Sequence, residues 1–513
     1  MKLGINLTNN ISQIRNVLNK YPILCDVIFF FITLVSCFLL FYSKWQICSN
    51  HSTYLHAAWE TLNGAKLYVD LIDFHLPGII LVNILCWFIG NSELIAIRML
   101  DILSVFILCI SAAWIMMKWQ ISFPIRVFSL TLFLISYLFN GPCETAEIET
   151  FALAFTMLGL IPWLSQQKEM KKYCWVASGI FIGLSLWTSF FHVLFFVFTL
   201  YYLFPKDKSE QKIYLQNLSA CIIGVIITSA GFISWLYSTG SLNGFIQWGI
   251  KFYFNEYLQA QLPLKTMLEA LIQKLWYLDE KWPLIYVGFV LFISYIFDKQ
   301  RFKTKETELN ILLGLLAVSL VAIILQGKIL QHQLIPLQFF LVFLGALITS
   351  GIAIPKIYQD LKPITIIICL IFLVYTGLGY TKRINTNDKL EKLVTELKKY
   401  MEEDETFVTF GATPYLYYKL HRTIKYPFIN SLTMYETSNL NTKKEIIDEL
   451  INVLQNKKVK FFIVQNQDTA PFNGQSQNTR AIVGQYIGLG KLRELGFIRN
   501  TTVFELDIFE RIH

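Results

Sequence analysis

A short stretch between two apolar runs of the sequence gathers acidic and histidine side chains. The stretch KLYVDLIDFHLPG, residues 66 to 78, contains Asp70, Asp73 and His75. Carboxylates can take a proton from a hydroxyl group or hold a divalent cation such as Mg²⁺ or Mn²⁺. If the neighbouring runs cross a bilayer, ionisable groups at its edge are costly to keep and indicate a functional site. A solvated loop is the alternative, and Asp70 and Asp73 would share a face only if the segment were helical.

A second acidic cluster precedes the apolar run that starts at residue 151. The sequence CETAEIETF, residues 143 to 151, contains Glu144, Glu147 and Glu149. Glu144 and Glu147 would align on one face of a helix. The dipole of any helix also favours acidic residues in its first turn, so a purely structural role stays open. Two acidic clusters on one rim of a membrane protein would favour a substrate-binding or catalytic site.

Two further segments carry residues suited to substrate binding. The sequence QGKILQHQLIPLQFF, residues 326 to 340, places Lys328 and His332 in a short turn between two apolar runs. A cation there suits a lipid phosphate or pyrophosphate, although a histidine in such a turn can also serve packing. The sequence GFIQWGIKFYFNEYL, residues 244 to 258, carries Lys251, Asn255 and Tyr257 among aromatics that could form an interfacial belt.

The composition is that of an integral membrane protein. Of 513 residues, 54% are hydrophobic, 15% aromatic and 16% charged, and the mean hydropathy is +0.48. The formal net charge of +8 is spread over short loops between apolar runs, where retention on the cytoplasmic side explains it. We therefore expect the lipid bilayer as a partner and no nucleic acid. The apolar stretch from residue 24 to 41 has no cleavage site after it and reads as a signal anchor.

The nine cysteines do not form a disulfide framework, because most of them lie inside apolar runs. Cys48 and Cys143 could both fall in polar segments on one side of the membrane. A bridge between these two stays open.

The apolar runs predict a multi-span α-helical membrane protein with about 11 to 13 transmembrane helices. Candidate spans are residues 24 to 43, 94 to 117, 122 to 139, 151 to 166, 173 to 189, 190 to 204, 215 to 237, 283 to 297, 309 to 326, 334 to 352 and 363 to 380. The shorter run 77 to 92 opens with Pro77 and Gly78. If it lies in the membrane surface or re-enters, five basic loops fall on the cytoplasmic side, as the positive-inside rule requires.

With this topology, four polar segments and the tail share the outer face. The segments are residues 44 to 76, 140 to 150, 238 to 282 and 327 to 333. In the tail, DKLEKLVTELKKYM and TKKEIIDELINVLQ read as helices, and TFVTFG, VKFFIVQ and TTVFELDIFERI read as strands. We therefore predict a transmembrane domain over residues 1 to 383, with a first outer loop at 44 to 76, and an extracytoplasmic α/β domain over 384 to 513.

Together these stretches resemble the GT-C superfamily of membrane glycosyltransferases. The likeness is greatest to the bacterial branch related to protein mannosyltransferases (glycosyltransferase family 39) and to the aminoarabinose transferase, and it covers nearly the whole chain. The family pattern Tyr-x-Asp-x-x-Asp-x-x-x-Pro corresponds to YVDLIDFHLPG, the glycine-rich span to ASGIFIGLSLW and the asparagine-tyrosine segment to FNEYL. A histidine in a short outer turn before a proline-containing helix corresponds to HQLIPL.

The resemblance implies a glycosyltransferase of the bacterial inner (cytoplasmic) membrane that acts in envelope glycan biosynthesis. It would move a sugar from a polyprenyl-phosphate donor to an envelope acceptor, a glycan, lipid or protein, on the extracytoplasmic face. A carboxylate of the first outer loop would activate the acceptor hydroxyl. The positions that match the family are Asp70 and Asp73 as acidic residues, His75 and Pro77 after them, Glu147 or Glu149 as a further acidic residue, Asn255 and Tyr257, and Lys328 and His332 near the donor phosphate.

The chain departs from the family pattern at two positions. The first acidic residue of the family falls at Asn50, with His51 beside it, and the lysine that follows the glycine-rich span falls near Ser189. Either Asp70 or Asp73 is then the base, or His51 is, or the chain is a non-catalytic relative that binds glycan or lipid. A lipid or polysaccharide transporter is the other alternative, but transporters keep ionisable groups near the bilayer midplane and these spans are almost free of charge.

Overall fold

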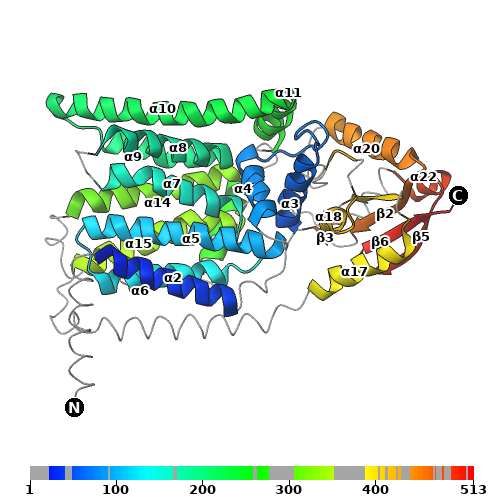
Figure 1. The fold of residues 1–513 in the computed structure, drawn as a ribbon, viewed down its shortest axis with the longest axis horizontal. Helices are drawn as coiled ribbons and strands as arrows, with labels where there is room; N and C mark the ends of the chain where they lie inside the picture. Colours follow the sequence, from blue (N-terminus) through cyan, green and yellow to red (C-terminus); the bar gives the residue numbers. More distant parts are fainter. Residues whose placement is uncertain are drawn as a thin grey trace, which may run out of the picture.

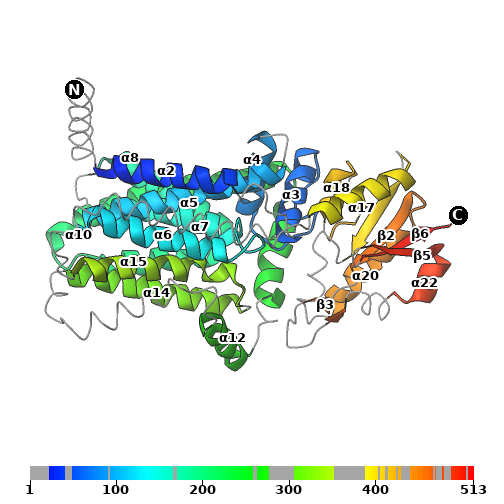
Figure 2. The ribbon, with the colours of Figure 1, turned by 90° about the horizontal axis from the view of Figure 1, so that it is seen from below.

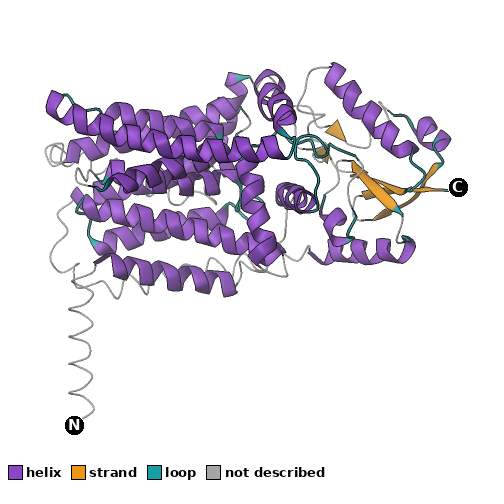
Figure 3. Ribbon diagram, turned by 45° about the horizontal axis from the view of Figure 1, so that its top comes forward, coloured by secondary structure: helices purple, strands orange, loops and turns teal. Residues whose placement is uncertain are grey.

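The structure is a computed structural model, described here for residues 22–40, 49–89, 93–165, 170–257, 263–276, 305–327, 329–351, 387–402 and, with short gaps, 405–512. A helical bundle lies at one end, a small α/β tail at the other, and the first loop with α3 (Ser49–Leu62) and α4 (Pro77–Ile89) lies between them (Figures 1 and 2). We call the end of the bundle that faces the tail the tail-side end. All named strands belong to the tail (Figure 3).

The bundle consists of long apolar helices that run along one axis (Figure 1). They are α2 (Pro22–Leu40), α5 (Glu93–Lys118), α6 (Phe123–Phe139), α7 (Ile148–Leu164), α8 (Lys172–Thr188), α9 (Val193–Tyr202), α10 (Lys208–Ser238), α14 (Glu306–Gln326) and α15 (Ile335–Gly351). Within the described chain, four stretches are long and apolar enough to cross a membrane: Ile95–Lys118, Lys208–Ser238, Glu306–Gln326 and His332–Ser350. The predicted multi-span helical fold is confirmed, and the expected spans 283–297 and 363–380 lie outside the described residues.

Glycines let the helices of the glycine-rich span pack backbone against backbone. A Cβ atom on Gly179 of α8 would collide with the carbonyl oxygen of Cys221 in α10, and one on Gly224 of α10 would collide with that of Val176. Small residues that allow such close approach are a common means of helix association in membranes. The sequence ASGIFIGLSLW therefore fixes the centre of the bundle.

The short apolar run after Pro77 forms α4 at the tail-side end (Figure 1). Its 13 residues are about 20 Å long, too short for a hydrocarbon core of about 30 Å. Exposed Leu85 and Phe88 suit contact with lipid. A Cβ on Gly78 would collide with the backbone of Trp187, so α4 packs directly on the end of α8.

The tail is a four-stranded mixed sheet with helices on both faces. The strand order is β1 (Thr406–Phe410), β2 (Val459–Gln465), β6 (Leu506–Arg511) and β5 (Phe497–Val503); β1 and β2 are parallel, and the other pairs are antiparallel. Helices α17 (Asn387–Tyr400) and α20 (Leu440–Gln455) lie on opposite sides of it (Figure 1). The smaller elements are α18 (Tyr415–Lys419), β3 (Asp468–Thr469), β4 (Gln477–Asn478) and α22 (Leu489–Glu494).

The α/β character of the tail is confirmed, but the single closing strand expected from TTVFELDIFERI is wrong. Its residues belong to two antiparallel strands, β5 and β6. The sequence between them has no Gly, Asn or Pro, so it lacks the residues that mark a tight turn.

The tail packs against the first loop of the bundle domain. The backbone N–H of Ile72 donates to the carbonyl of Pro427 at 2.6 Å, and Ile72 forms an isolated β-bridge with Phe428. The ring of His56 in α3 lies 5.0 Å from that of Tyr417. One hydrophobic cluster accordingly includes both the first loop and the sheet of the tail. The domain boundary predicted at residue 384 lies outside the described residues.

The remaining helical segments join the bundle to this layer. They are η2 (Phe190–His192), α11 (Leu242–Gly244), the π-helix η3 (Phe245–Tyr257), α12 (Leu264–Trp276) and η6 (His332–Leu334). The η3 segment contacts the tail through Glu256, which accepts a hydrogen bond from Thr442 of α20 at 3.0 Å.

Candidate functional site

The two aspartates of the first loop have different surroundings. Residues 66 to 73 form turns rather than a helix, so Asp70 and Asp73 do not share a helical face. Asp70 is exposed, and its Oδ2 accepts a hydrogen bond from the backbone N–H of Lys66 at 2.8 Å. Asp73 is only 1% exposed, and its Oδ1 lies 2.7 Å from His75 Nδ1. Within the described chain, Asp73 Oδ2 is buried without a hydrogen-bond partner.

Two tyrosines fix the histidine that holds Asp73. The hydroxyl of Tyr54, from α3, lies 3.3 Å from His75 Nε2, and the hydroxyl of Tyr68 donates to the His75 carbonyl at 2.6 Å. Burial raises the pKa of Tyr68 well above its usual value, and the charge of Asp73 raises it further. Tyr68 is therefore a neutral hydrogen-bond donor. The backbone of Tyr68 is left-handed, with φ at 66°, which is uncommon outside glycine and occurs at tight turns.

One turn before Tyr54 on α3, His51 reaches the second acidic segment. Its Nε2 lies 2.7 Å from the carbonyl oxygen of Thr145 and 3.5 Å from Glu147 Oε1. Complete burial, reinforced by the charge of Arg98, lowers the pKa of His51 well below 6.5. The ring is then neutral, with Nε2–H donating to Thr145. His51 and Tyr54, three residues apart on one helical face, connect the two acidic segments.

Arginine and tyrosine side chains from the bundle hold the second acidic segment. Arg98 of α5, which is fully buried, donates from Nη1 to Thr145 Oγ1 at 3.1 Å and from Nη2 to the Pro142 carbonyl at 2.8 Å. The hydroxyl of Tyr137 in α6 accepts the N–H of Ala146 at 3.0 Å. It also donates to Asp101 Oδ1 at 2.5 Å. Tyr137 lies in an apolar run, so no sequence pattern marked it as a site residue.

The third segment, residues 326 to 340, contacts the second acidic segment through His332, which lies between two glutamates. Its Nδ1 is 2.7 Å from Glu144 Oε2, and its Nε2 is 3.8 Å from Glu149 Oε2. Carboxylates facing both ring nitrogens favour the imidazolium form. Burial alone would raise the pKa of Glu144, but the hydrogen bonds and charge of His332 outweigh it and lower that pKa. Glu144 precedes α7, so it does not align with Glu147 on a helix as the spacing suggested.

Comparisons with known proteins show which solved structures have a similar fold. No family model and no curated protein matches the sequence. The structure is similar to that of ArnT from Cupriavidus metallidurans bound to undecaprenyl phosphate, with a TM-score of 0.59 over 95% of this chain and 98% of ArnT at 10% identity. The chain has the GT-C fold. The arabinofuranosyltransferase AftD from Mycobacteria is also similar, with a TM-score of 0.50 and 12% identity over 94% of this chain and 40% of AftD.

The GT-C fold brings together some of the residues singled out in the sequence and not others. Asp73, His75, His51, Glu147, Glu149 and His332 meet at the tail-side end, joined by the contacts above. Asp70 and Asn255 are exposed, and no described contact joins either to that group. Lys328 and the side chains of Asn50 and Tyr257 lie outside the described part of the chain.

The described residues offer no preformed metal centre in this GT-C fold. Among them, no group of three or more His, Cys, Asp or Glu side chains is arranged to hold a metal ion. A divalent cation, Mg²⁺ or Mn²⁺, stays a prediction from the sequence.

The acidic segment also carries an oxidised cysteine. Cys143 is disulfide-bonded, whereas the other described cysteines form no disulfide: Cys25, Cys37, Cys86, Cys109, Cys174 and Cys221. Cys48, the partner considered from the sequence, lies outside the described residues.

Proposed function

We propose that the protein is a membrane glycosyltransferase that moves a sugar from a polyprenyl-phosphate donor to an envelope acceptor at the tail-side end. The observation that carries this proposal is Asp73: a buried carboxylate, held by His75, with one oxygen left without a partner among the described residues. The GT-C fold supports the reaction class, and the ArnT structure, which holds undecaprenyl phosphate, supports the donor class.

Asp73 is the residue that we assign as general base. Oδ1 is engaged by His75, so Oδ2 is the atom that would take the proton from the acceptor hydroxyl. The hydroxyl oxygen would bond to the anomeric carbon, and the bonding electrons of the sugar–phosphate bond would leave with the donor phosphate. Tyr54 and Tyr68 position His75, and through it Asp73. His51 donates to Thr145, so we assign it a positioning role.

For the donor phosphate we propose the turn that contains Lys328 and His332. A cationic side chain offsets the charge that develops on a leaving phosphate. His332 is cationic between Glu144 and Glu149, and those two carboxylates offset part of its charge. Lys328 would therefore carry most of the attraction for the phosphate.

We propose that the tail-side end faces the extracytoplasmic side of a bacterial inner membrane. Disulfides persist in oxidising compartments, and Cys143 belongs to the tail-side end. Lys118, Lys171, Lys172, Lys206 and Lys208 all lie at the opposite end, as the positive-inside rule expects of a cytoplasmic face. In cells whose outer envelope is permeabilised and whose cytoplasmic membrane is intact, a maleimide that cannot cross the cytoplasmic membrane should label a cysteine placed at exposed Asp70. It should not label a cysteine placed at Lys206.

Mass analysis of envelope glycans tests the proposed function. Cells without the gene should lack a sugar residue that the wild-type gene restores. The same gene carrying Asp73→Asn should reach the membrane at the normal level and fail to restore that residue. Identical glycans in all of these strains would overturn the proposal. Flux of a glycolipid into proteoliposomes that contain no acceptor would favour a transporter instead.

A further inference from the structure

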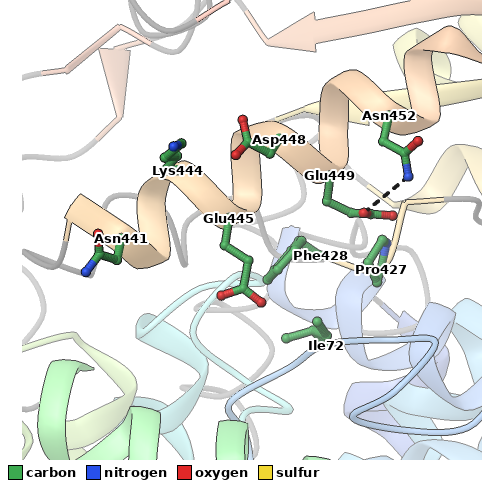
Figure 4. Close-up of a pocket in the computed structure, with 9 residues that line it drawn as sticks. All are labelled: Ile72, Pro427, Phe428, Asn441, Lys444, Glu445, Asp448, Glu449 and Asn452. Carbon is green, nitrogen blue, oxygen red and sulfur yellow. Dashed lines mark hydrogen bonds between the residues drawn. The ribbon is translucent and has the colours of Figure 1, made fainter.

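A groove separates α20 of the tail from the first loop. It has a cavity volume of about 730 Å³, within the range of small-molecule sites. Its upper wall carries Glu445, Asp448 and Glu449 from α20, and its floor is formed by Ile72 and Phe428 (Figure 4). Two distant parts of the chain therefore build it, which a solvated helix face alone would not require.

The groove combines hydrogen-bond acceptors with an apolar floor. Figure 4 shows Glu445 and Glu449 directed from α20 toward Phe428 and Pro427. Within the described chain, Glu445 and Asp448 make no hydrogen bond or ion pair, so their oxygens are free to accept. Phe428 is held in place by Trp248, whose ring lies 5.5 Å away and nearly perpendicular to it. Carboxylates above a flat apolar surface suit a sugar, which has hydroxyl donors around its edge and C–H groups on its faces.

The charge of the groove selects among glycans. The charged residues that line it are three carboxylates and one cation, Lys444. Phosphate or carboxylate groups on a ligand would be repelled there, whereas hydroxyl and ammonium groups would be attracted. The groove is therefore unsuited to the phosphate of the donor and suited to a hydroxyl-rich glycan without anionic groups.

The groove borders the loop that carries the candidate base, although Asp73 itself is buried and is not among the residues that line it. Ile72, on its floor, is the residue before Asp73 and is hydrogen-bonded to Pro427 on the same floor. We propose that the groove is an acceptor subsite that binds a neutral or amino-bearing glycan next to the loop that carries Asp73. This inference rests on the proposed function, because an acceptor exists only if the protein transfers sugar.

Binding of small saccharides to the full chain in detergent tests the groove. The probes are cellobiose, maltose, the disaccharide of glucosamine, and maltose 1-phosphate. Binding of each is measured by saturation-transfer NMR. We expect at least one of the first three to bind and maltose 1-phosphate to bind more weakly than maltose. The double variant Glu445→Gln with Glu449→Gln should weaken binding about tenfold, which corresponds to about 1.4 kcal/mol.

The matched control is Glu396→Gln, an exposed acidic residue of α17 on the opposite side of the sheet. It should leave saccharide binding within about twofold of the wild type. Binding unaffected by the double variant, preference for the phosphorylated sugar, or no saccharide binding at all would overturn the inference.

The glycan analysis of gene-deleted cells distinguishes failure of the acceptor-subsite inference from failure of the proposed function. If the deletion removes a sugar residue but the groove variants bind saccharide normally, the transferase stands and the subsite does not. If disaccharides bind in the groove but the deletion changes no glycan, the acceptor role is overturned together with the transferase.

Discussion

The two acidic segments at the tail-side end use their carboxylates differently. In residues 141 to 150, Glu144 and Glu149 face His332, and Glu147 faces His51. In the first loop, Asp73 has one oxygen bound to His75 and a second that is buried without a partner among the described residues. Glu149 Oε2 is likewise buried without a hydrogen-bond partner among the described residues, so the unpartnered oxygen alone does not separate the segments. The difference is that the three glutamates face histidines of other elements and tie their segment to α3 and η6, whereas Asp73 faces a histidine of its own loop. The comparison is consistent with the proposal that Asp73 is the base and that the second segment supports the site.

The largest effect is expected from Asp73→Asn. An amide in place of the carboxylate cannot take a proton at neutral pH, so the transfer rate should fall by about 10²-fold to 10⁴-fold. Donor binding should change little. Initial rates at saturating donor lipid test this, with thermal unfolding as a check that the fold persists. A rate within about tenfold of the wild type would remove Asp73 from the base role.

Next in size is the effect of Arg98→Met on the second segment. The variant removes a buried cation that donates to both Thr145 and Pro142. Breaking a buried charged network costs about 3 to 5 kcal/mol of unfolding free energy. Hydrogen exchange should rise first in residues 141 to 147. The control is Lys118→Met, exposed at the end of the same helix, which should cost less than about 1 kcal/mol. Equal stability of the two variants would contradict the support role.

A smaller effect is expected from Glu144→Gln in acid. The pKa of Glu144 is lower in the folded protein than its usual 4.5, because His332 stabilises the charged form. The stability from this group is therefore complete above about pH 4.5 and is lost as the pH falls through the lowered folded value. Thermal unfolding followed from about pH 6 to about pH 3 should show a shallower loss in Glu144→Gln than in the wild type. Parallel curves would show that His332 does not stabilise this carboxylate.

The smallest effect is expected from Asp70→Asn. Asp70 is exposed and serves the turn that begins at Lys66, and asparagine can accept the same hydrogen bond. The transfer rate should stay within about twofold of the wild type, and the unfolding free energy within about 1 kcal/mol. A loss comparable to that of Asp73→Asn would show that both aspartates act in the reaction.

The sequence predicted the architecture well because hydropathy and periodicity are local signals. Length and apolar content set the long helices of the bundle, and Pro77 with Gly78 marked the short helix α4. The alternation of helix and strand likewise predicted the tail. The β5–β6 pair was missed because the two residues that separate the strands in the sequence, Phe504 and Glu505, are not types that mark a turn.

The internal order of the site could not be predicted from the sequence. The spacing does not distinguish Asp70 from Asp73. In the structure a left-handed Tyr68 precedes the exposed Asp70, and the contact of Ile72 with the tail directly precedes the buried Asp73. Arg98 and Tyr137 lie in apolar runs, and Arg98 finds its partners more than 40 residues away. Contacts of this kind depend on how whole helices pack, which no local pattern encodes.

The hydrogen bond from Ile72 to Pro427 has a mechanical consequence. Ile72 is directly followed by Asp73. A tilt of the C-terminal domain would therefore either break this hydrogen bond or move Asp73 together with Ile72. A molecule that binds to that domain and tilts it would thereby shift the Asp73 side chain without contacting it.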